Sequence, residues 1–175
     1  MAEAARETLG DDLREGLVIT KHGHSRGPLP PLTIIEASHP VLDETSLTAG
    51  HAILEFARRL KPDCRVLILL SGGGSALAEV LPEGVTLKQV QYLNEQLLRS
   101  GAPIEELNRI RRRISRLKGG KLEALLRPHP IEVLILSDIV NGDPRDVASG
   151  PVFADPFAGQ SLMPLIRKYK SEAKR

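Results

Sequence analysis

Three consecutive glycines between two serines form a segment of this sequence that is suited to binding an anion. The residues are Ser71, Gly72, Gly73, Gly74 and Ser75, and an apolar run over 65–70 precedes them. Glycines let the backbone turn sharply and present its N–H groups, and a helix that begins at the turn adds the positive end of its dipole. Such a turn suits phosphate or carboxylate, with the serine hydroxyls as further donors. The simpler alternative is a tight turn between a strand and a helix.

A basic segment over 108–121 contains seven arginines and lysines and no acidic residue. Four polar residues recur within it every three or four positions: Asn108, Arg111, Ser115 and Lys118. At this spacing we expect them on one face of a helix, beside its apolar face. We expect the other arginines to point mostly toward solvent: Arg109, Arg112, Arg113 and Arg116. The aligned polar residues favour an anion-handling site, whereas the charge alone is also compatible with a solvated basic face or a nucleic-acid-binding surface.

Acidic residues follow a second apolar run, which covers 131–136. Asp138 stands just after this run, in the same position as the glycine-rich turn after the first one, and Asp143 follows five residues later. Carboxylates on one loop suit Mg²⁺, whose shell is usually completed by water and phosphate. One of them can instead accept a hydroxyl proton as a general base. Aspartate also forms turns beside glycine and proline, an alternative that fits Asp146 better than Asp138.

The composition narrows the function classes. The chain has 175 residues, 41% of them hydrophobic and only 3% aromatic, with a net charge of +2. The hydrophobic content excludes disorder over the whole length, and the few aromatic residues disfavour binding to single-stranded nucleic acid. With one cysteine, no apolar stretch of about 20 residues and no signal peptide at the start, we expect a soluble cytoplasmic protein without membrane contact.

The histidines and the single cysteine do not form a complete metal-binding or catalytic motif in the sequence. His22 and His24 have a spacing that can chelate a metal, but no third ligand stands near them in the sequence. We therefore expect these histidines and His39 to be structural or solvent-exposed, and Cys64 to be a packed thiol.

Strands alternate with helices along the chain, which predicts an α/β fold with a largely parallel sheet. The expected strands cover 16–20, 32–37, 65–70 and 131–136, and the expected helices cover 1–13, 45–60, 86–99, 103–118 and 121–127. The apolar runs over 65–70 and 131–136 are continuous, which predicts strands covered on both faces. A helix at the very start has no strand before it, although a right-handed βαβ unit requires one, so the first strand is expected to be missing.

The three segments occur in an order that resembles the glycerate 2-kinase family with a MOFRL-type C-terminal domain. The resemblance rests on Leu69–Ala76, Asn108–Gly120 and Ser137–Pro151, and it extends over Ala37–Asp43 and the first helix. It implies a Rossmann-like, three-layer α/β domain with a mainly parallel sheet. It also implies transfer of the γ-phosphoryl group of ATP to the 2-hydroxyl of D-glycerate, with Mg²⁺, in a cleft between two domains.

The resemblance also implies roles for the residues in these segments. Residues 71–75 would bind the phosphate or nucleotide, while Arg111 and Lys118 would neutralise the transferred group. Asp138 and Asp143 would hold Mg²⁺ or activate the hydroxyl, without the resemblance assigning either role to one of them. The expected substrate-positioning residues are Asn108, Ser115, Ser149 and Gly150.

Part of the family pattern is not found in this sequence. We expect residues 1–160 to form an N-terminal domain without its first strand and its Gly-x-Gly-Lys-Ala turn, and 161–175 to form a basic tail. Because the MOFRL domain is absent as well, we expect little or no activity from this chain alone, and a complementing C-terminal domain or a homo-oligomer as partner. The alternatives are a hydroxypyruvate reductase, although no G-x-G-x-x-G motif is present, and a non-catalytic anion- or nucleic-acid-binding module.

Overall fold

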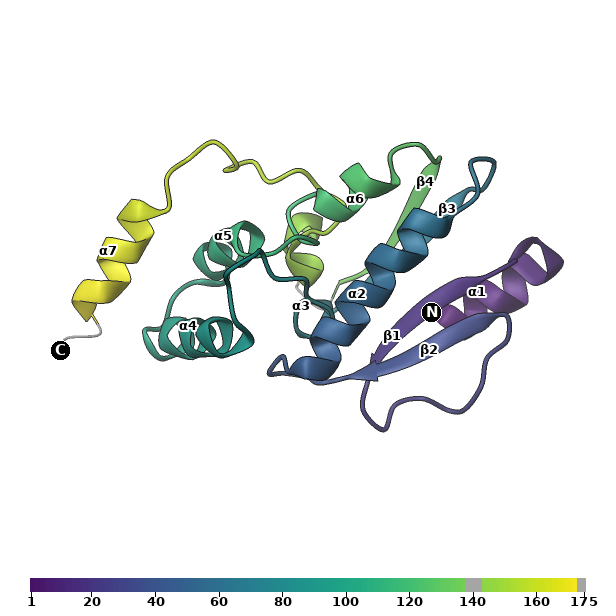
Figure 1. The fold of residues 1–175 in the computed structure, drawn as a ribbon, viewed down its shortest axis with the longest axis horizontal. Coiled ribbons are helices and arrows are strands. Elements are labelled where there is room, and N and C mark those ends of the chain that lie inside the picture. Colours follow the sequence, from purple (N-terminus) through teal and green to yellow (C-terminus); the bar gives the residue numbers. More distant parts are fainter. Residues whose placement is uncertain (138–142, 173–175) are drawn as a thin grey trace.

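The computed structural model describes residues 1–137 and 143–172, with side chains described as far as Tyr169 (Figure 1). Helices and strands alternate along most of this chain, as the sequence predicts. The elements are α1 (Ala2–Leu9), the 3-10 helix η1 (Gly10–Asp12), β1 (Gly16–Lys21), β2 (Leu32–Ala37), α2 (Glu44–Arg59), β3 (Val66–Ser71), α3 (Gly74–Leu77), α4 (Leu87–Arg99), α5 (Ile104–Arg113), α6 (Lys121–Leu126), β4 (Ile131–Leu136), the 3-10 helix η2 (Pro144–Ser149) and α7 (Met163–Glu172).

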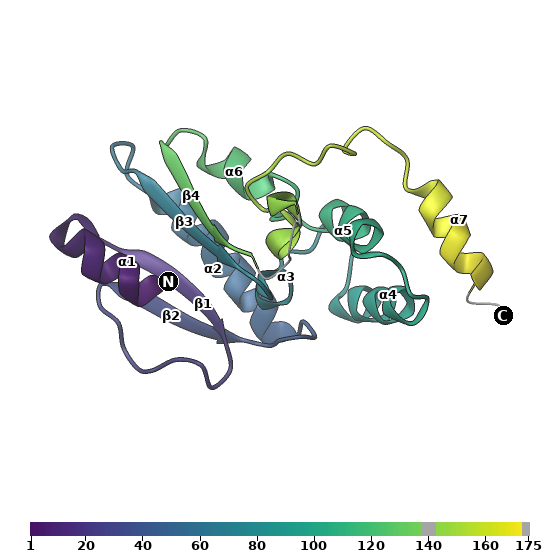
Figure 2. The same cartoon turned by 180° about the vertical axis from the view of Figure 1, so that it is seen from behind.

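The described strands pair in parallel and form two separate sheets. β1 pairs with β2, with Gly16 beside Leu32, and β3 pairs with β4, with Val66 beside Ile131. The longest helix, α2, lies over one face of the strands (Figure 1). α1 lies on the opposite side of the strands (Figure 2). The α/β class, with parallel strands and helices on both sides, is therefore confirmed.

The expectation that the apolar strands are covered on both faces is wrong for β4, whereas residues 66–70 of β3 are all half-buried. Burial alternates along β4, and Leu134 and Leu136 are 56% and 62% exposed. The parallel register places Leu69 of β3 beside Leu134, so these two leucines share one face of the sheet. Leu134 and Leu136 thus lie on a face of β4 that the described residues leave exposed.

Two helix starts follow from local hydrogen bonds that the sequence makes recognisable. At α4, Thr86 and Gln89 form a reciprocal capping box, as their spacing predicts. At α2, Asp43 accepts from the backbone of Thr45 and Ser46, and the Ser46 hydroxyl accepts in return from the Asp43 N–H. These caps fix where α2 and α4 begin.

α5 is shorter than the helix expected over 103–118. Hydrogen bonds to the Ser115 hydroxyl and to the Val80 carbonyl replace those that would continue the helix. The helix stops at Arg113, and the Ser115 hydroxyl then accepts from the N–H groups of Leu117 and Lys118. The Arg116 N–H donates to the Val80 carbonyl at 2.8 Å instead of continuing the helix. Ser115 and Lys118 consequently lie beyond α5, so the expected polar face does not extend along one helix.

Two apolar clusters hold the helices together. One joins α4, α5 and α7 through Leu97, Leu107, Ile110, Leu165 and Tyr169. The other joins α2 to the segments that follow α3 and α5, through Leu54, Val80 and Leu117. The segment expected as a basic tail thus contains α7, whose Leu165 and Tyr169 pack against α4 and α5. No helix in the described residues is long and apolar enough to cross a membrane.

Candidate functional site

The three segments singled out in the sequence meet beyond the carboxyl ends of β3 and β4. The glycine-rich turn follows β3, the Asp143–Gly150 segment follows β4 in the chain, and α5 packs against η2. In open parallel sheets this edge is where ligands bind. The view from behind shows α3, η2 and α5 gathered at this end of the molecule (Figure 2).

A chain of side-chain hydrogen bonds joins the three segments. Ser149 donates from Oγ to Oδ1 of Asn108 at 2.8 Å, and it accepts from the Ser75 hydroxyl at 3.0 Å. The amide of Asn108 then donates to Asp146 at 3.0 Å. Ser149 and Asn108 are each only 1% exposed, so both belong to a buried polar network that fixes the turn after β3 relative to α5.

The glycine-rich turn presents backbone donors that no described residue satisfies. The N–H groups of residues 72–75 have no hydrogen-bond acceptor in the described part of the chain. Gly73 has φ of 82°, which favours glycine, and a β-carbon on Gly74 would lie 2.9 Å from that of Ala148. The helix that follows has only four residues, so the expected dipole of a longer helix is not available. The anion-binding capacity of the turn rests on its own N–H groups and on Ser71 and Ser75.

The segment opposite this turn has an unusual backbone conformation. Ala148, Ser149 and Gly150 have φ values of 52°, 60° and 64°, of which only the last is at a glycine. Left-handed conformations at residues with a β-carbon cost free energy and persist where neighbours enforce them. Here the Ser149 carbonyl accepts from the Nε of Arg112 and from the Gly119 N–H, each at 3.3 Å.

The expectation that Arg109, Arg112, Arg113 and Arg116 mostly face solvent holds for Arg113 and Arg116, which are exposed, but it is wrong for Arg112, and Arg109 is half-buried. Arg112 is only 5% exposed and contacts Asp146 and Asp155 at 3.0 and 3.8 Å. Arg109 stacks on the Phe157 ring at 4.4 Å, and Arg113 donates to the Gln160 carbonyl. These arginines connect α5 to the segments after β4.

Arg111 is a half-buried cation of α5 that lacks a carboxylate ion pair in the described residues, as Arg109 also does. Its Nε donates to the side-chain oxygen of Asn94 on α4 at 3.2 Å. Burial lowers the pKa of the Arg111 guanidinium, and Glu79 opposes this effect. A guanidinium held in place without an ion-pair partner is suited to a phosphate or carboxylate group.

Lys118 is instead paired with a carboxylate that the sequence analysis missed. Its ammonium group contacts Glu79 and also donates to the Ala78 carbonyl at 3.3 Å. Lys118 and Glu79 are 3% and 4% exposed, and the second oxygen of Glu79 accepts from the Val80 N–H at 2.9 Å. Burial lowers the pKa of Lys118, and the charge of Glu79 opposes this effect. A glutamate among apolar residues was the available signal for this pair.

Of the two candidate magnesium ligands, only Asp143 is described, because Asp138 lies outside the described residues. Asp143 accepts from the backbone N–H and from Nε of Arg145, at 2.9 and 2.7 Å. These hydrogen bonds from Arg145 lower the pKa of Asp143 to about 2. No group of three metal-binding side chains occurs in the described part of the chain.

Replacing Arg145 with Gln is expected to move the titration of Asp143 back toward that of an ordinary aspartate. In the native chain this carboxylate stays ionised until the pH falls to about 2, because Arg145 stabilises its charged form. Its lowered pKa favours the folded state above the pKa of an unfolded aspartate, and this contribution is lost as the pH falls toward 2. Carbon-13 NMR of the side-chain carboxyl measures the shift; an unchanged titration in R145Q contradicts the assignment.

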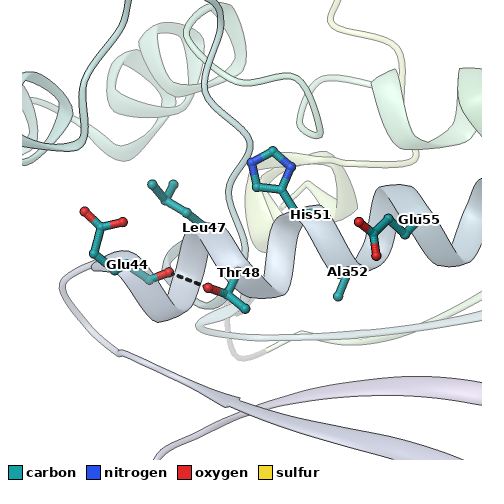
Figure 3. Close-up of a pocket in the computed structure, with 6 residues that line it drawn as sticks. All are labelled: Glu44, Leu47, Thr48, His51, Ala52 and Glu55. Carbon is teal, nitrogen blue, oxygen red and sulfur yellow. Dashed lines mark hydrogen bonds between the residues drawn. The ribbon is translucent and has the colours of Figure 1, made fainter.

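Surface depressions lie away from this site. One runs along the exposed side of α2 and is lined by Glu44, Leu47, Thr48, His51, Ala52 and Glu55 (Figure 3). The hydrogen bond drawn there, from Thr48 to the Glu44 carbonyl at 3.0 Å, lies within the helix itself. We assign no binding role to this depression, since its polar groups do not converge on one point.

Cys64 and His129 contact each other at the amino-terminal ends of β3 and β4, away from the candidate site. The Cys64 sulfur lies 3.5 Å from Nδ1 of His129, although 65 residues separate them in sequence. Cys64 is a free thiol of intermediate exposure. Nothing in the sequence near either residue indicated this pairing.

The fold and the site together define an α/β protein with a glycine-rich turn and a half-buried cationic side chain at the carboxyl edge of its strands. The chain belongs to the family described as a domain of unknown function (DUF4147), whose model matches residues 1–175. The resemblance stated from the sequence is thereby confirmed at the level of the family.

The chain is similar to proteins named as glycerate kinases. A D-glycerate 2-kinase of Thermotoga maritima is 44% identical over 173 residues, which cover 98% of this chain and 41% of the relative. A crystal structure of glycerate kinase from the same organism superposes with a TM-score of 0.91 at 42% identity, over 97% of this chain and 41% of that one. A relative from Agrobacterium vitis has a provisional name as a hydroxypyruvate reductase and is 39% identical, over 95% of this chain and 43% of the relative. The chain thus spans about two fifths of the length of these curated relatives.

Proposed function

We propose that this chain provides the phosphate-binding part of a D-glycerate 2-kinase, which transfers the γ-phosphoryl group of ATP to the 2-hydroxyl of D-glycerate. The main support is the Ser75–Ser149–Asn108 hydrogen-bond chain, which brings three separate segments of polar residues to one edge of the sheet. Phosphoryl transfer depends mostly on positioning and on electrostatic stabilisation of the transferred group.

The proposed roles follow from what each group can donate. The turn at 71–75 binds phosphate oxygens through its N–H groups and its two serine hydroxyls, and Arg111 neutralises the transferred group. Asn108, Ser115, Ser149 and Gly150 position the substrate by fixing the segments around it. In this proposal Lys118 contacts the transferred phosphoryl group only when that group replaces Glu79 as the ion-pair partner of Lys118.

Asp143 is suited to one position in a magnesium shell. Mg²⁺ is usually held by one or two carboxylates, with phosphate oxygens and water as the other ligands. Asp143 is partly exposed and its pKa of about 2 keeps it ionised at neutral pH. When bound, the ion would neutralise charge on the phosphates. We propose Asp143 and Asp138 as the protein ligands of this ion. Alternatively, one of the two aspartates acts as the general base that accepts the proton of the 2-hydroxyl of glycerate.

The remainder of the active-site cleft is proposed to come from another polypeptide segment, either a C-terminal domain of the MOFRL type or a second copy of the chain. Residues 1–160 are then one α/β domain, and the segment over 161–175 follows it. This proposal is compatible with the chain's coverage of about two fifths of its curated relatives.

A chimaeric enzyme tests the proposed function directly. We expect the Thermotoga maritima D-glycerate 2-kinase to retain ATP-dependent formation of 2-phosphoglycerate when this chain replaces its matching segment. Enolase coupling detects the 2-phospho isomer specifically, and the same preparation is tested for consumption of NADH with hydroxypyruvate. Arg111→Gln is expected to lower kcat/KM by about a hundredfold, whereas the exposed control Arg116→Gln leaves it unchanged.

An inactive chimaera that folds like its host contradicts the kinase proposal. NADH consumption without phosphorylation would favour the reductase instead. Equal kcat/KM values for R111Q and R116Q would remove Arg111 from the proposed site.

A further inference from the structure

His39 lies against the glycine-rich turn, although the sequence analysis expects it to be structural or solvent-exposed. It follows β2, in the segment that leads to α2, so it comes from a different strand than the turn itself. A β-carbon built on Gly73 would lie 2.8 Å from Nε2 of His39 and 3.1 Å from its Cδ2. The nitrogen edge of the imidazole ring is therefore directed at the backbone of the turn.

Gly73 satisfies two requirements at this contact. Its φ of 82° favours glycine, and any side chain there would collide with the His39 ring. The ring is thus able to approach the turn closely because position 73 has no β-carbon. This contact makes His39 a neighbour of the N–H groups of residues 72–75, which lack acceptors among the described residues.

The imidazole is also chemically available. In the described part of the chain no hydrogen bond engages a ring nitrogen of His39, and its side chain is exposed. Two of the other four histidines differ in this respect: the His22 ring contacts the Thr45 hydroxyl at 3.4 Å, and His129 contacts Cys64. An imidazole can donate a hydrogen bond from Nε2 to an anion in its neutral form and in its charged form.

We propose that His39 is a further binding residue of this site, which donates from Nε2 to an oxygen of the same phosphate group that the glycine-rich turn binds. The inference rests on the proposed phosphate-binding function of the turn. It adds a donor from β2 to those from β3, so that the phosphate is bound from two sides. The ligand class is a terminal or bridging phosphate, as found in a nucleoside triphosphate or in inorganic pyrophosphate.

The test uses the 175-residue chain, inorganic pyrophosphate as the probe, and nitrogen-15 NMR of backbone amides and histidine rings. We expect saturable shifts of the amides at 72–75 together with a shift of the His39 ring nitrogens. His39→Ala is expected to weaken pyrophosphate binding about tenfold, because a hydrogen bond to a charged group is lost. His39→Gln should recover part of the affinity, since its amide also donates. The matched control His51→Gln, exposed on α2, should bind as the native chain does.

The outcomes separate this inference from the proposal on which it rests. Amide shifts at 72–75 with the same dissociation constant in H39A, or without movement of the native His39 ring, overturn the role of His39 and leave the phosphate-binding turn intact. The absence of any saturable shift overturns both. The ring measurement needs no substitution, so a variant that fails to fold does not obscure the result.

Discussion

Replacing Lys118 with Met is expected to lower the free energy of unfolding by about 3–5 kcal/mol at neutral pH. The substitution keeps the aliphatic bulk of the side chain and removes its charge. It leaves the Glu79 carboxylate buried without its ion-pair partner, with a hydrogen bond from the Val80 N–H and the charges of Arg111 and Lys121 nearby. Removing one partner of a buried pair is more damaging than removing both, because an uncompensated charge remains in a poorly solvated position.

Urea denaturation followed by circular dichroism measures this effect. The control is Lys88→Met on the exposed surface of α4, where we expect a change below about 0.5 kcal/mol. The double variant with Glu79→Met and Lys118→Met should be more stable than K118M, since neither charge is then buried alone. Equal urea midpoints for K118M and K88M would show that Glu79 and Lys118 are not a buried pair in solution.

Replacing Gly50 with Ala is expected to destabilise the fold by about 3 kcal/mol, although alanine is the better helix former. Gly50 lies in the middle of α2 and is buried against the segment after α3. A β-carbon there would overlap the carbonyl oxygen of Glu79 and lie 3.0 Å from its nitrogen. Backbone atoms cannot rotate away as a flexible side chain can, so α2 or the Glu79 segment has to shift.

The matched control is His51→Ala, at the next position of the same helix but on its exposed side. We expect H51A to change the free energy of unfolding by less than about 0.5 kcal/mol. A G50A variant that is as stable as H51A, or more stable, contradicts the close packing of α2 on Glu79. Because the displaced segment carries Glu79, G50A should also disturb the environment of Lys118, which lysine NMR can detect independently.

Local signals in the sequence predicted the elements well, and the contacts between distant residues could not be predicted in the same way. The caps at Asp43 and Thr86 are formed by residues within three positions of each helix start, although only Thr86 was recognised. The end of α5 was missed because it depends on Val80, whose carbonyl accepts from Arg116, 36 positions further along the chain. No periodicity can report such a contact.

The candidate site shows the same division. The glycine-rich turn and Arg111 stand out by residue type, while Ser75 and Ser149 meet only because the fold brings their segments together. Spacing placed Arg112 toward solvent, whereas Asp146 and Asp155 from beyond β4 enclose it. Glu79 and His39 were undervalued because their partners come from elsewhere in the chain. Position 138 stays a prediction, since it lies outside the described residues.

The division of the strands into two parallel pairs has a consequence for how the molecule opens. Since the described residues form no backbone ladder between β1–β2 and β3–β4, neither pair needs to break hydrogen bonds with the other when it opens. The cooperativity between them then depends on contacts outside the ladders, chiefly those of α2 with β1 and β2 and those of α3 with β1 and α2. Amide hydrogen exchange should therefore resolve two units of different protection, coupled through α2 and α3.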